Sequence, residues 1–237
     1  MKTKQLRNQE TKKQQDWPAF LPLATGFIRQ HSFIACPPLV PEIELHLAES
    51  ITPLWRACED FLQKPNVPPP FWSVAWPGGQ ALARLLLDGR EDVKGKRVLD
   101  FASGSGLVAF AAAKAGAASV TANDVDPLAI AAIGLNAQRN NLDLNVLHDN
   151  LVGRDLVDYD LILAGDFCYE WPMAGYAVEW LRAEVKKGRR VIFADPGRPH
   201  APRTGIKELW RVDVPASLEV EDAEVKNTGV FRLLSEG

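Results

Sequence analysis

The chain has 237 residues, of which 46% are hydrophobic and 24% are charged, and its formal net charge is −3. These values are typical of a soluble globular protein with one main domain. They give no general reason to expect a nucleic-acid partner, since such partners usually require a strongly basic surface. No apolar run approaches the roughly 18 residues of a membrane helix, so we expect no membrane partner.

The first 16 residues, MKTKQLRNQETKKQQD, form the one basic cluster of the chain. The run has no apolar periodicity, which predicts a disordered polar tail, and it lacks the apolar stretch of a secretory signal. The three cysteines are scattered, which disfavours a disulfide framework and favours a reducing cytoplasm. The four histidines show no metal-ligand spacing, so we predict no metal site.

Residues 17–70 are predicted to form a small N-terminal cap with helical and extended parts. A short helix is expected around 19–31, a strand-like alternation follows at 42–47, and a second helix is expected over 50–61. The proline-rich run 64–70 reads as a stiff connector. We treat the segment as a cap because it is too short to bury much of its own surface, and we assign residues 71–237 to the main domain.

The main domain begins with the aromatic stretch 71–79, which leads into a predicted helix over 80–88 that Gly89 ends. Trp72 and Trp76 lie in this stretch. Two core aromatics under a lid are the more common interpretation of such a pair.

From residue 94 onward, predicted strands and helices alternate. A short helix is expected near 204–209, and the tail 210–234 indicates two or three strands, with 211–214 and 218–225 both candidates for the sixth. This order is typical of a doubly wound α/β fold closed by an antiparallel final strand. The expected strands are 97–101, 119–122, 145–148, 160–164 and 190–194, and the expected helices are 106–115, 128–140 and 173–187.

A glycine loop follows the first of these strands, in the stretch Val98-Leu-Asp-Phe-Ala-Ser-Gly-Ser-Gly106. Gly104-Ser-Gly106-Leu-Val-Ala109, with Asp124 twenty residues after Gly104, fits a dinucleotide-binding fingerprint. Two observations weigh against that interpretation. The loop comes after roughly a hundred residues, whereas the fingerprint usually opens its domain, and Asp100 would repel a pyrophosphate.

The acidic character of the predicted sheet edge favours S-adenosylmethionine, which carries a sulfonium and an ammonium and no phosphate. The chemistry predicts that Asp100 faces the methionine part, directly or through water. Asp124 would bind the ribose hydroxyls, and Asp149 or Asn150 the adenine amino group. Asp124 and Asp126 also fit helix caps, and Asp149 or Asn150 a loop turn. The main chain under the ligand would be that of Ala102, Ser103, Gly104 and Gly106, and the acids at strand ends are Asp100, Asp124, Asp126, Asp149, Asp166 and Asp195.

These stretches resemble the seven-stranded, Rossmann-like S-adenosylmethionine-dependent methyltransferases. More narrowly, the chain resembles the family that methylates lysines in the β subunit of electron transfer flavoprotein. The similarity runs from about residue 27 to the end of the chain. The matching segments are Pro41-Glu-Ile-Glu-Leu, Trp76-Pro-Gly-Gly-Gln-Ala-Leu, Val98 to Gly106, Ala122-Asn-Asp-Val-Asp-Pro, Gly165-Asp-Phe-Cys-Tyr and Asp195-Pro-Gly-Arg-Pro.

The resemblance implies a protein-lysine N-methyltransferase that acts on the β subunit of electron transfer flavoprotein. It implies that Asp166 and Tyr169 belong to the catalytic signature and that Trp76 packs against the cofactor. Asp166 would accept a hydrogen bond from the incoming amine. Ala102 stands where many relatives have glycine, and Arg198 suits either an acidic substrate surface or local carbonyls.

Other functions remain open. A ribosomal-protein methyltransferase or a small-molecule N- or O-methyltransferase would use the same cofactor site. A dinucleotide-binding reductase or a non-catalytic binding module would not. Binding of S-adenosylhomocysteine, compared with binding of NAD, separates the two cofactor classes.

Overall fold

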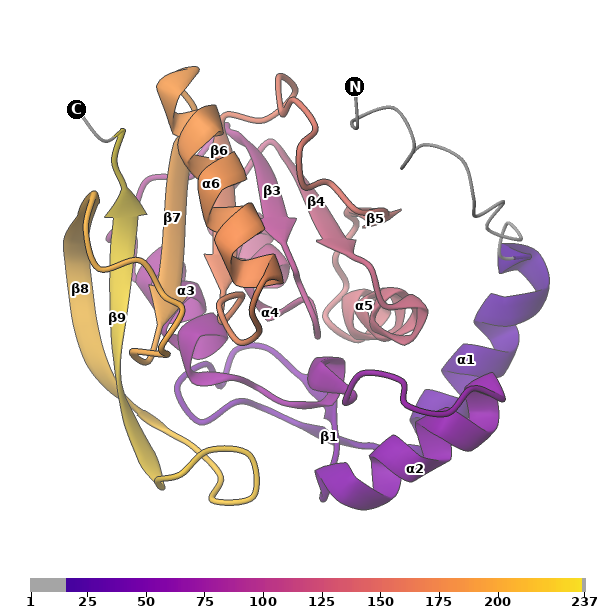
Figure 1. The fold of residues 1–237 in the computed structure, drawn as a ribbon. Coiled ribbons are helices and arrows are strands. Elements are labelled where there is room, and N and C mark those ends of the chain that lie inside the picture. The colour runs from indigo at the N-terminus through magenta and orange to yellow at the C-terminus, as the bar shows by residue number, and fades with distance from the viewer. Residues whose placement is uncertain (1–15, 236–237) are drawn as a thin grey trace, which may run out of the picture.

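The computed structural model describes residues 16–235, whose centre is a sheet of seven strands in the order β5-β4-β3-β6-β7-β9-β8 (Figure 1). Strands β3 to β7 pair in parallel, while β9 is antiparallel to both β7 and β8. The predicted α/β class with an antiparallel final strand is therefore confirmed. The strands are β3 (Arg97–Phe101), β4 (Ser119–Asp124), β5 (Asn145–His148), β6 (Leu161–Gly165), β7 (Arg190–Asp195), β8 (Ile206–Pro215) and β9 (Val225–Leu233).

Helices cover both faces of the sheet, because side chains of the central strands alternate between two hydrophobic clusters. Val98 and Leu161 pack in the cluster that includes α3 (Pro77–Leu87), α4 (Leu107–Lys114) and α5 (Pro127–Arg139). Leu99 and Ile162 pack in the cluster of α6 (Met173–Lys186). Figure 1 shows α6 in front of the sheet and α4 behind it. Strands buried on both faces explain the nearly continuous apolar runs in the sequence.

The N-terminal segment packs against α5. It contains α1 (Trp17–His31), the antiparallel pair β1 (Phe33–Ala35) and β2 (Leu45–Leu47), α2 (Ile51–Leu62) and the 3₁₀ turn η1 (Phe71–Ser73). Buried residues of α1 and α2 share a cluster with five residues of α5. Both predicted helices are present, but only residues 45–47 of the alternating stretch form a strand.

Asn136 connects this segment to the glycine loop. Its side chain is completely buried on α5. Oδ1 accepts a hydrogen bond from the His46 N–H of β2 at 2.8 Å, and Nδ2 donates to the Ser105 carbonyl at 2.8 Å. A single amide therefore joins the main chains of two regions that lie far apart in the sequence.

Three expectations about the elements are wrong. Residues 206–209 begin β8 and are not helical, because they pair with β9 from the register Ile206↔Leu233 onward. Residues 218–224 form turns and bends of the β8–β9 loop and no sixth strand. The helix expected over 80–88 begins at Pro77, so the Trp-Pro-Gly-Gly motif forms its N-terminus.

None of the helices within residues 16–235 has both the length and the apolar character needed to cross a membrane.

Candidate active site

The switch point of the sheet lies at β3, which has β4 on one side and β6 on the other. The loops after these strands leave in opposite directions, so a crevice forms outside the carboxyl ends of the strands. Asp100 lies near the end of β3, and Asp166 directly follows β6. Both line one large cavity at this edge. The strand that Asp166 follows, β6, pairs directly with β3, the strand that leads into the glycine loop.

The glycine loop is held by hydrogen bonds from both ends. Asp100 Oδ2 accepts hydrogen bonds from the Ser103 hydroxyl and, at 3.0 Å, from the Ala109 N–H of α4. The loop turns through left-handed backbone, with φ of 55° at Ala102, 54° at Gly104 and 90° at Gly106. Glycine adopts these angles without strain, and alanine does not. The departure from the family pattern at Ala102 therefore lies at a strained position.

Asp100 is the buried anchor of this loop, with an exposed fraction of 1%. Burial raises the pKa of its carboxyl to about 7, and the hydrogen bonds from Ser103 and Ala109 oppose that shift. One oxygen is used within the loop. The role of the second oxygen toward the methionine part of the cofactor stays a prediction.

Asp124 and Asp126 have different roles at the end of β4. Asp124 Oδ2 accepts a hydrogen bond from the Gly104 N–H at 2.9 Å, and Oδ1 accepts one from the Asp126 N–H at 3.0 Å. Asp126 caps α5, because its Oδ1 accepts a hydrogen bond from the Leu128 N–H at 2.8 Å. Burial raises the pKa of both carboxyls, to about 7 for Asp126. Asp124 therefore ties β4 to the glycine loop and also lines the cavity.

Of the two residues that follow β5, Asp149 forms a surface ion pair and Asn150 lines the cavity. Asp149 lies 2.7 Å from the guanidinium of Arg154 and is not part of the cavity lining. Asn150 lines the cavity, while its Oδ1 accepts a hydrogen bond from the Val152 N–H at 3.1 Å. The adenine-binding role predicted for this pair stays a prediction, and the placement favours Asn150.

Asp166 is pressed against the first turn of α3. Its Oδ2 accepts a hydrogen bond from the Gly79 N–H at 2.8 Å. A Cβ at Gly78 would lie 2.5 Å from the same oxygen and 2.6 Å from the Ala194 carbonyl. Only glycine leaves room for the carboxylate here, which explains Gly78, the first glycine of the Trp-Pro-Gly-Gly motif.

The second oxygen of Asp166 faces Arg198. Oδ1 is buried and makes no hydrogen bond within the described part of the chain, although the Arg198 guanidinium lies 3.2 Å away. Burial raises the pKa of Asp166 to about 7, while Arg198 and the Gly79 N–H oppose the shift. A buried carboxylate oxygen without a hydrogen bond, at a cavity wall, is suited to accept one from a ligand.

Within residues 16–235, the Arg198 side chain donates a hydrogen bond to a carboxylate and not to a local carbonyl, while its predicted role toward an acidic substrate surface stays a prediction. Its guanidinium lies 2.9 Å from Glu221 Oε1, in the β8–β9 loop, and 5.7 Å from the centre of the Trp76 ring. The Arg198 N–H donates a hydrogen bond to Asp195 Oδ1 at 2.6 Å. The Asp-Pro-Gly-Arg motif thus places the buried guanidinium of Arg198 next to Asp166.

Aromatic side chains form one wall of the cavity. Tyr169 is 51% exposed, and its ring centre lies 4.7 Å from that of Phe71. Trp76 donates a hydrogen bond from Nε1 to the Phe71 carbonyl at 2.8 Å and lines the cavity. Trp72 is a core aromatic, with an exposed fraction of 1%. The interpretation of two core aromatics therefore holds for Trp72 alone.

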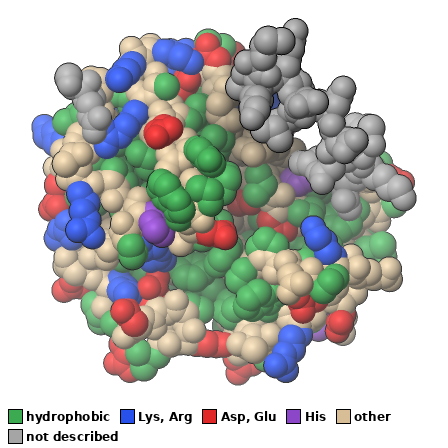
Figure 2. All heavy atoms as spheres, in the orientation of Figure 1, with side chains coloured by type: hydrophobic (Ala, Val, Ile, Leu, Met, Phe, Trp, Pro, Cys, Tyr) green, Lys and Arg blue, Asp and Glu red, His purple; other side chains and the backbone are tan. Residues whose placement is uncertain are grey.

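The cavity has a volume of about 780 Å³, which lies in the range of small-molecule sites. Figure 2 shows this side of the molecule hollowed, with hydrophobic and acidic side chains gathered around the hollow. Five carboxylates and two cationic side chains line it, and one of the cations, Arg198, is already paired. This charge suits a cationic ligand better than a polyphosphate. The charged lining residues are Lys64, Asp100, Asp124, Asp126, Asp166, Glu170 and Arg198.

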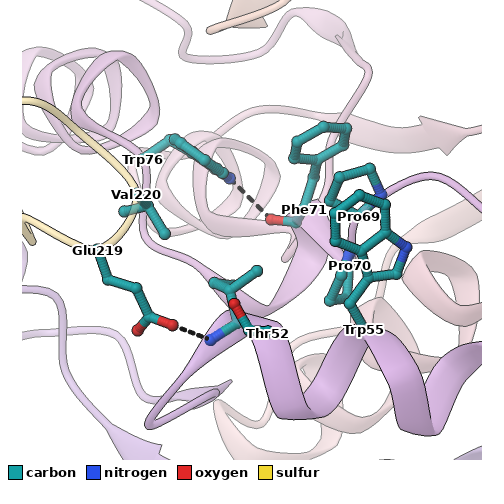
Figure 3. Close-up of a pocket in the computed structure, with 9 residues that line it drawn as sticks. Thr52, Trp55, Pro69, Pro70, Phe71, Trp76, Glu219 and Val220 are labelled. Carbon is teal, nitrogen blue, oxygen red and sulfur yellow. Dashed lines mark hydrogen bonds between the residues drawn. The ribbon is translucent and has the colours of Figure 1, made fainter.

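A smaller cavity of about 250 Å³ adjoins the large one (Figure 3). It lies between α2, the proline-rich connector and the β8–β9 loop, and it shares Pro69, Pro70, Phe71 and Trp76 with the large cavity. Glu219 fixes its rim, because Oε1 accepts a hydrogen bond from the Ile51 N–H at 2.9 Å.

The structure brings most of the predicted site residues to the large cavity. Its lining includes Trp76, Asp100, Ala102, Ser103, Gly104, Asp124, Asn150, Asp166 and Tyr169. Gly106 is buried behind the loop, where a Cβ would meet the Phe110 ring at 2.5 Å. The sequence interpretation missed Glu221, which no local motif marks. It also missed the Gly79 N–H, although two adjacent glycines at a helix start are a signal of close approach.

The model for ribosomal protein L11 methyltransferase (PrmA) matches residues 81–165, which run from α3 to the end of β6. A solved structure of a putative SAM-dependent methyltransferase from Streptococcus mutans superposes with a TM-score of 0.54 at 13% identity. It covers 86% of this chain and 56% of its own, and this likeness concerns the fold alone.

Several curated relatives carry the name electron transfer flavoprotein beta subunit lysine methyltransferase. The protein from Xenopus laevis is 43% identical over 178 residues, which cover 73% of this chain and 70% of the relative. The protein from Homo sapiens is 38% identical, over 81% of this chain and 72% of the relative. The resemblance noted in the sequence is confirmed at this level of identity and coverage. The chain belongs to the family of electron transfer flavoprotein beta subunit lysine methyltransferases.

Proposed function

We propose that this protein is an S-adenosylmethionine-dependent protein-lysine N-methyltransferase whose acceptor is the β subunit of electron transfer flavoprotein. The observation that carries the proposal is Asp166 Oδ1, a buried carboxylate oxygen without a hydrogen bond in the cavity that the glycine loop also lines. Family membership supports the choice of acceptor.

The residues of the loop fit the cofactor by their chemistry. S-adenosylmethionine supplies an electrophilic methyl group on a sulfonium. Ala102 to Gly104 line the cavity, and the tight left-handed turn of their backbone would let the main chain approach the ligand closely. Asp100 and Asp124 would hold the ammonium and the ribose hydroxyls. Asn150 would bind the adenine, and Trp76 would pack against the cofactor.

Asp166 would orient the acceptor amine. Lysine has a pKa near 10.4, so about one in a few thousand is neutral at pH 7, and a buried site disfavours the ammonium form. Because the Gly79 N–H fixes Oδ2, Oδ1 would accept one N–H of the amine and so direct its nitrogen lone pair. Tyr169, Phe71 and Trp76 wall the channel and keep water from the reacting atoms. Alignment of this kind supplies much of the rate.

The test compares two carboxylates of the cavity. Asp166→Asn should abolish methyl transfer to the flavoprotein subunit and leave the Kd for S-adenosylhomocysteine within a few fold. Asp124→Asn should raise that Kd about tenfold to a hundredfold, since hydrogen bonds to charged groups contribute about 1.5–3 kcal/mol. Labelled S-adenosylmethionine and calorimetry measure the two effects.

Glu179→Gln, an exposed change on α6, is the matched control and should behave as wild type. Wild-type transfer by the Asp166→Asn variant would refute the assigned role. Tight binding of NAD without binding of S-adenosylhomocysteine would refute the proposed cofactor.

Ribosomal protein L11 is the second candidate acceptor, because the PrmA model matches residues 81–165. That range contains the glycine loop and Asp124 but not Asp166, Tyr169 or Arg198. It therefore covers cofactor residues more fully than acceptor residues. Equal concentrations of L11 and of the flavoprotein subunit in one labelling reaction decide between them, and a label on L11 alone would favour the second candidate.

We also propose a cytoplasmic location. All three cysteines are free, and Cys58 and Cys168 are buried, as suits a reducing compartment. Cell fractionation tests the assignment, and recovery in a membrane or secreted fraction would contradict it.

A further inference from the structure

The Arg198 guanidinium lies between two buried carboxylates. Its Nη2 is 2.9 Å from Glu221 Oε1 and 3.2 Å from Asp166 Oδ1, but only the contact with Glu221 is a hydrogen bond. The side chain of Arg198 is 15% exposed, and those of the two acids are 7% exposed. Arg198 is therefore held by Glu221 and only attracted by Asp166.

Glu221 is fixed in place by its surroundings. It belongs to the β8–β9 loop, and its Oε2 lies 3.4 Å from Lys226 Nζ on β9. Two residues earlier, Glu219 accepts hydrogen bonds from the Ser50 hydroxyl at 2.7 Å and from the Ile51 N–H at 2.9 Å, which ties the loop to the start of α2. The carboxylate is therefore presented to Arg198 by a loop anchored at two points.

The other groups around Asp166 do not replace this arrangement. Asp195, at the end of β7, accepts hydrogen bonds from the N–H groups of Gly197 and Arg198 and adds a second negative charge near Asp166. From the Asp166 loop itself, the Cys168 thiol has a pKa raised by burial, so it stays neutral. From α3, the Gly79 N–H holds Oδ2. Arg198 is the cation that acts directly on the remaining oxygen, and Lys226 acts through Glu221.

We propose that Glu221 is a positioning residue: by holding Arg198, it keeps Asp166 Oδ1 available to the amine of the methyl acceptor. The role toward the acceptor rests on the proposed function. An arginine fork pairs readily with both oxygens of one carboxylate. Without Glu221, the guanidinium would turn to Asp166 and occupy the oxygen that the amine requires.

The first test measures the protonation of Asp166 and needs no acceptor. In protein labelled with ¹³C at the aspartate carboxyl groups, the Asp166 signal is assigned by its loss in Asp166→Asn and followed with pH. Glu221→Gln should lower its titration midpoint by about one pH unit, because the pairing with Arg198 tightens and a negative charge is lost. Arg198→Ala should raise the midpoint.

Glu224→Gln is the matched control, an exposed acid of the same loop, and it should leave the midpoint unchanged. If the Kd of Glu221→Gln for S-adenosylhomocysteine differs from that of wild type by more than threefold, Glu221→Asp replaces this variant. Glu221→Asp should lower the Asp166 titration midpoint by a smaller amount. An Asp166 midpoint that is the same in wild type and in the folded Glu221 variant would overturn the proposal.

The second test measures transfer. Glu221→Gln should lower kcat/KM for the flavoprotein subunit about tenfold, yet it should cause no further loss in an Arg198→Ala background, since Glu221 acts through Arg198. Equal losses in both backgrounds would overturn that route. If wild type transfers no methyl group to protein lysines, the proposed function fails, while the Asp166 titration still decides whether Glu221 controls Arg198.

Discussion

Ala102 is the residue of the glycine loop whose backbone conformation does not suit its side chain. It stands at φ 55°, where a left-handed L-residue costs roughly 1–2 kcal/mol, whereas glycine costs about 0.5–1 kcal/mol of extra chain entropy. Strain of this kind persists where surrounding contacts fix the chain. The next residue, Ser103, is fixed in this way, because its N–H donates a hydrogen bond to the Asn123 carbonyl at 2.9 Å.

We therefore expect Ala102→Gly to stabilise the protein by about 0–1.5 kcal/mol in urea unfolding, by relief of that strain. Ala183→Gly, at an exposed position of α6, is the control and should cost about 1 kcal/mol. Equal losses in the two variants would show that the loop backbone is not strained.

The residues of the site divide into those that a sequence can reveal and those that it cannot. Asp100, Gly104 and Asp124 follow a local pattern, so their placement at one sheet edge was predictable from strand ends alone. Glu221 meets Arg198 across the chain, between the β8–β9 loop and the end of β7, and no spacing rule relates the two. Long-range ion pairs of this kind become visible only in the fold.

At the scale of elements, the position of α3 depends on two glycines, Gly78 in the helix and Gly165 at the end of β6. A Cβ atom at Gly78 would collide with Asp166 and with the Ala194 carbonyl. A Cβ atom at Gly165 would lie 2.9 Å from the Cα of Gly79. The helix start therefore touches the ends of β6 and β7 directly. This approach brings the Gly79 N–H to Asp166.

Gly78→Ala should accordingly destabilise the protein by about 1–3 kcal/mol in urea unfolding, the usual cost of overpacking, and should impair methyl transfer. Gly134→Ala in α5 is the matched control, because a Cβ there meets nothing within 4 Å, and it should stabilise by about 0.4–1 kcal/mol. A Gly78→Ala variant as stable as Gly134→Ala would contradict the packing at α3.

The elements that sequence reasoning placed correctly are those with a strong local pattern. Helix α5 has an Asp-Pro start that the structure reproduces, with Asp126 as its cap. Residues 206–209 carry no such start signal, and their pairing with β9 overrides any helical preference. The end of the chain was therefore the part whose strands could not be fixed without knowledge of the partner strand.

At the scale of the whole molecule, the buried acids couple stability to pH. Burial raises the pKa of Asp100, Asp126 and Asp166 to about 7, whereas an unfolded aspartate has a pKa near 3.9. Between these values the folded protein binds more protons than the unfolded chain, so the free energy of unfolding falls as pH rises. Their stabilising contribution is complete below about pH 4 and is lost through pH 7.

We expect the urea concentration at the unfolding midpoint of the cofactor-free protein to decrease as the pH rises from about 5.5 to 7.5. The lowered pKa of His46 opposes this trend. Asp100→Asn should flatten the dependence, because it removes one of the three titrations. A midpoint that rises across this window would show that the acids are ionised more readily in the folded protein than their burial implies.

The Asn136 amide limits how freely the N-terminal segment can be replaced. The segment 17–70 and the glycine loop share this one side chain through His46 and Ser105. A segment transplanted from a relative with another acceptor must bring a main-chain N–H to the same point on α5. Without it, the buried amide loses a partner, at a cost of about 1–3 kcal/mol. The N-terminal segment and the glycine loop are therefore coupled through one buried side chain and are not independent modules.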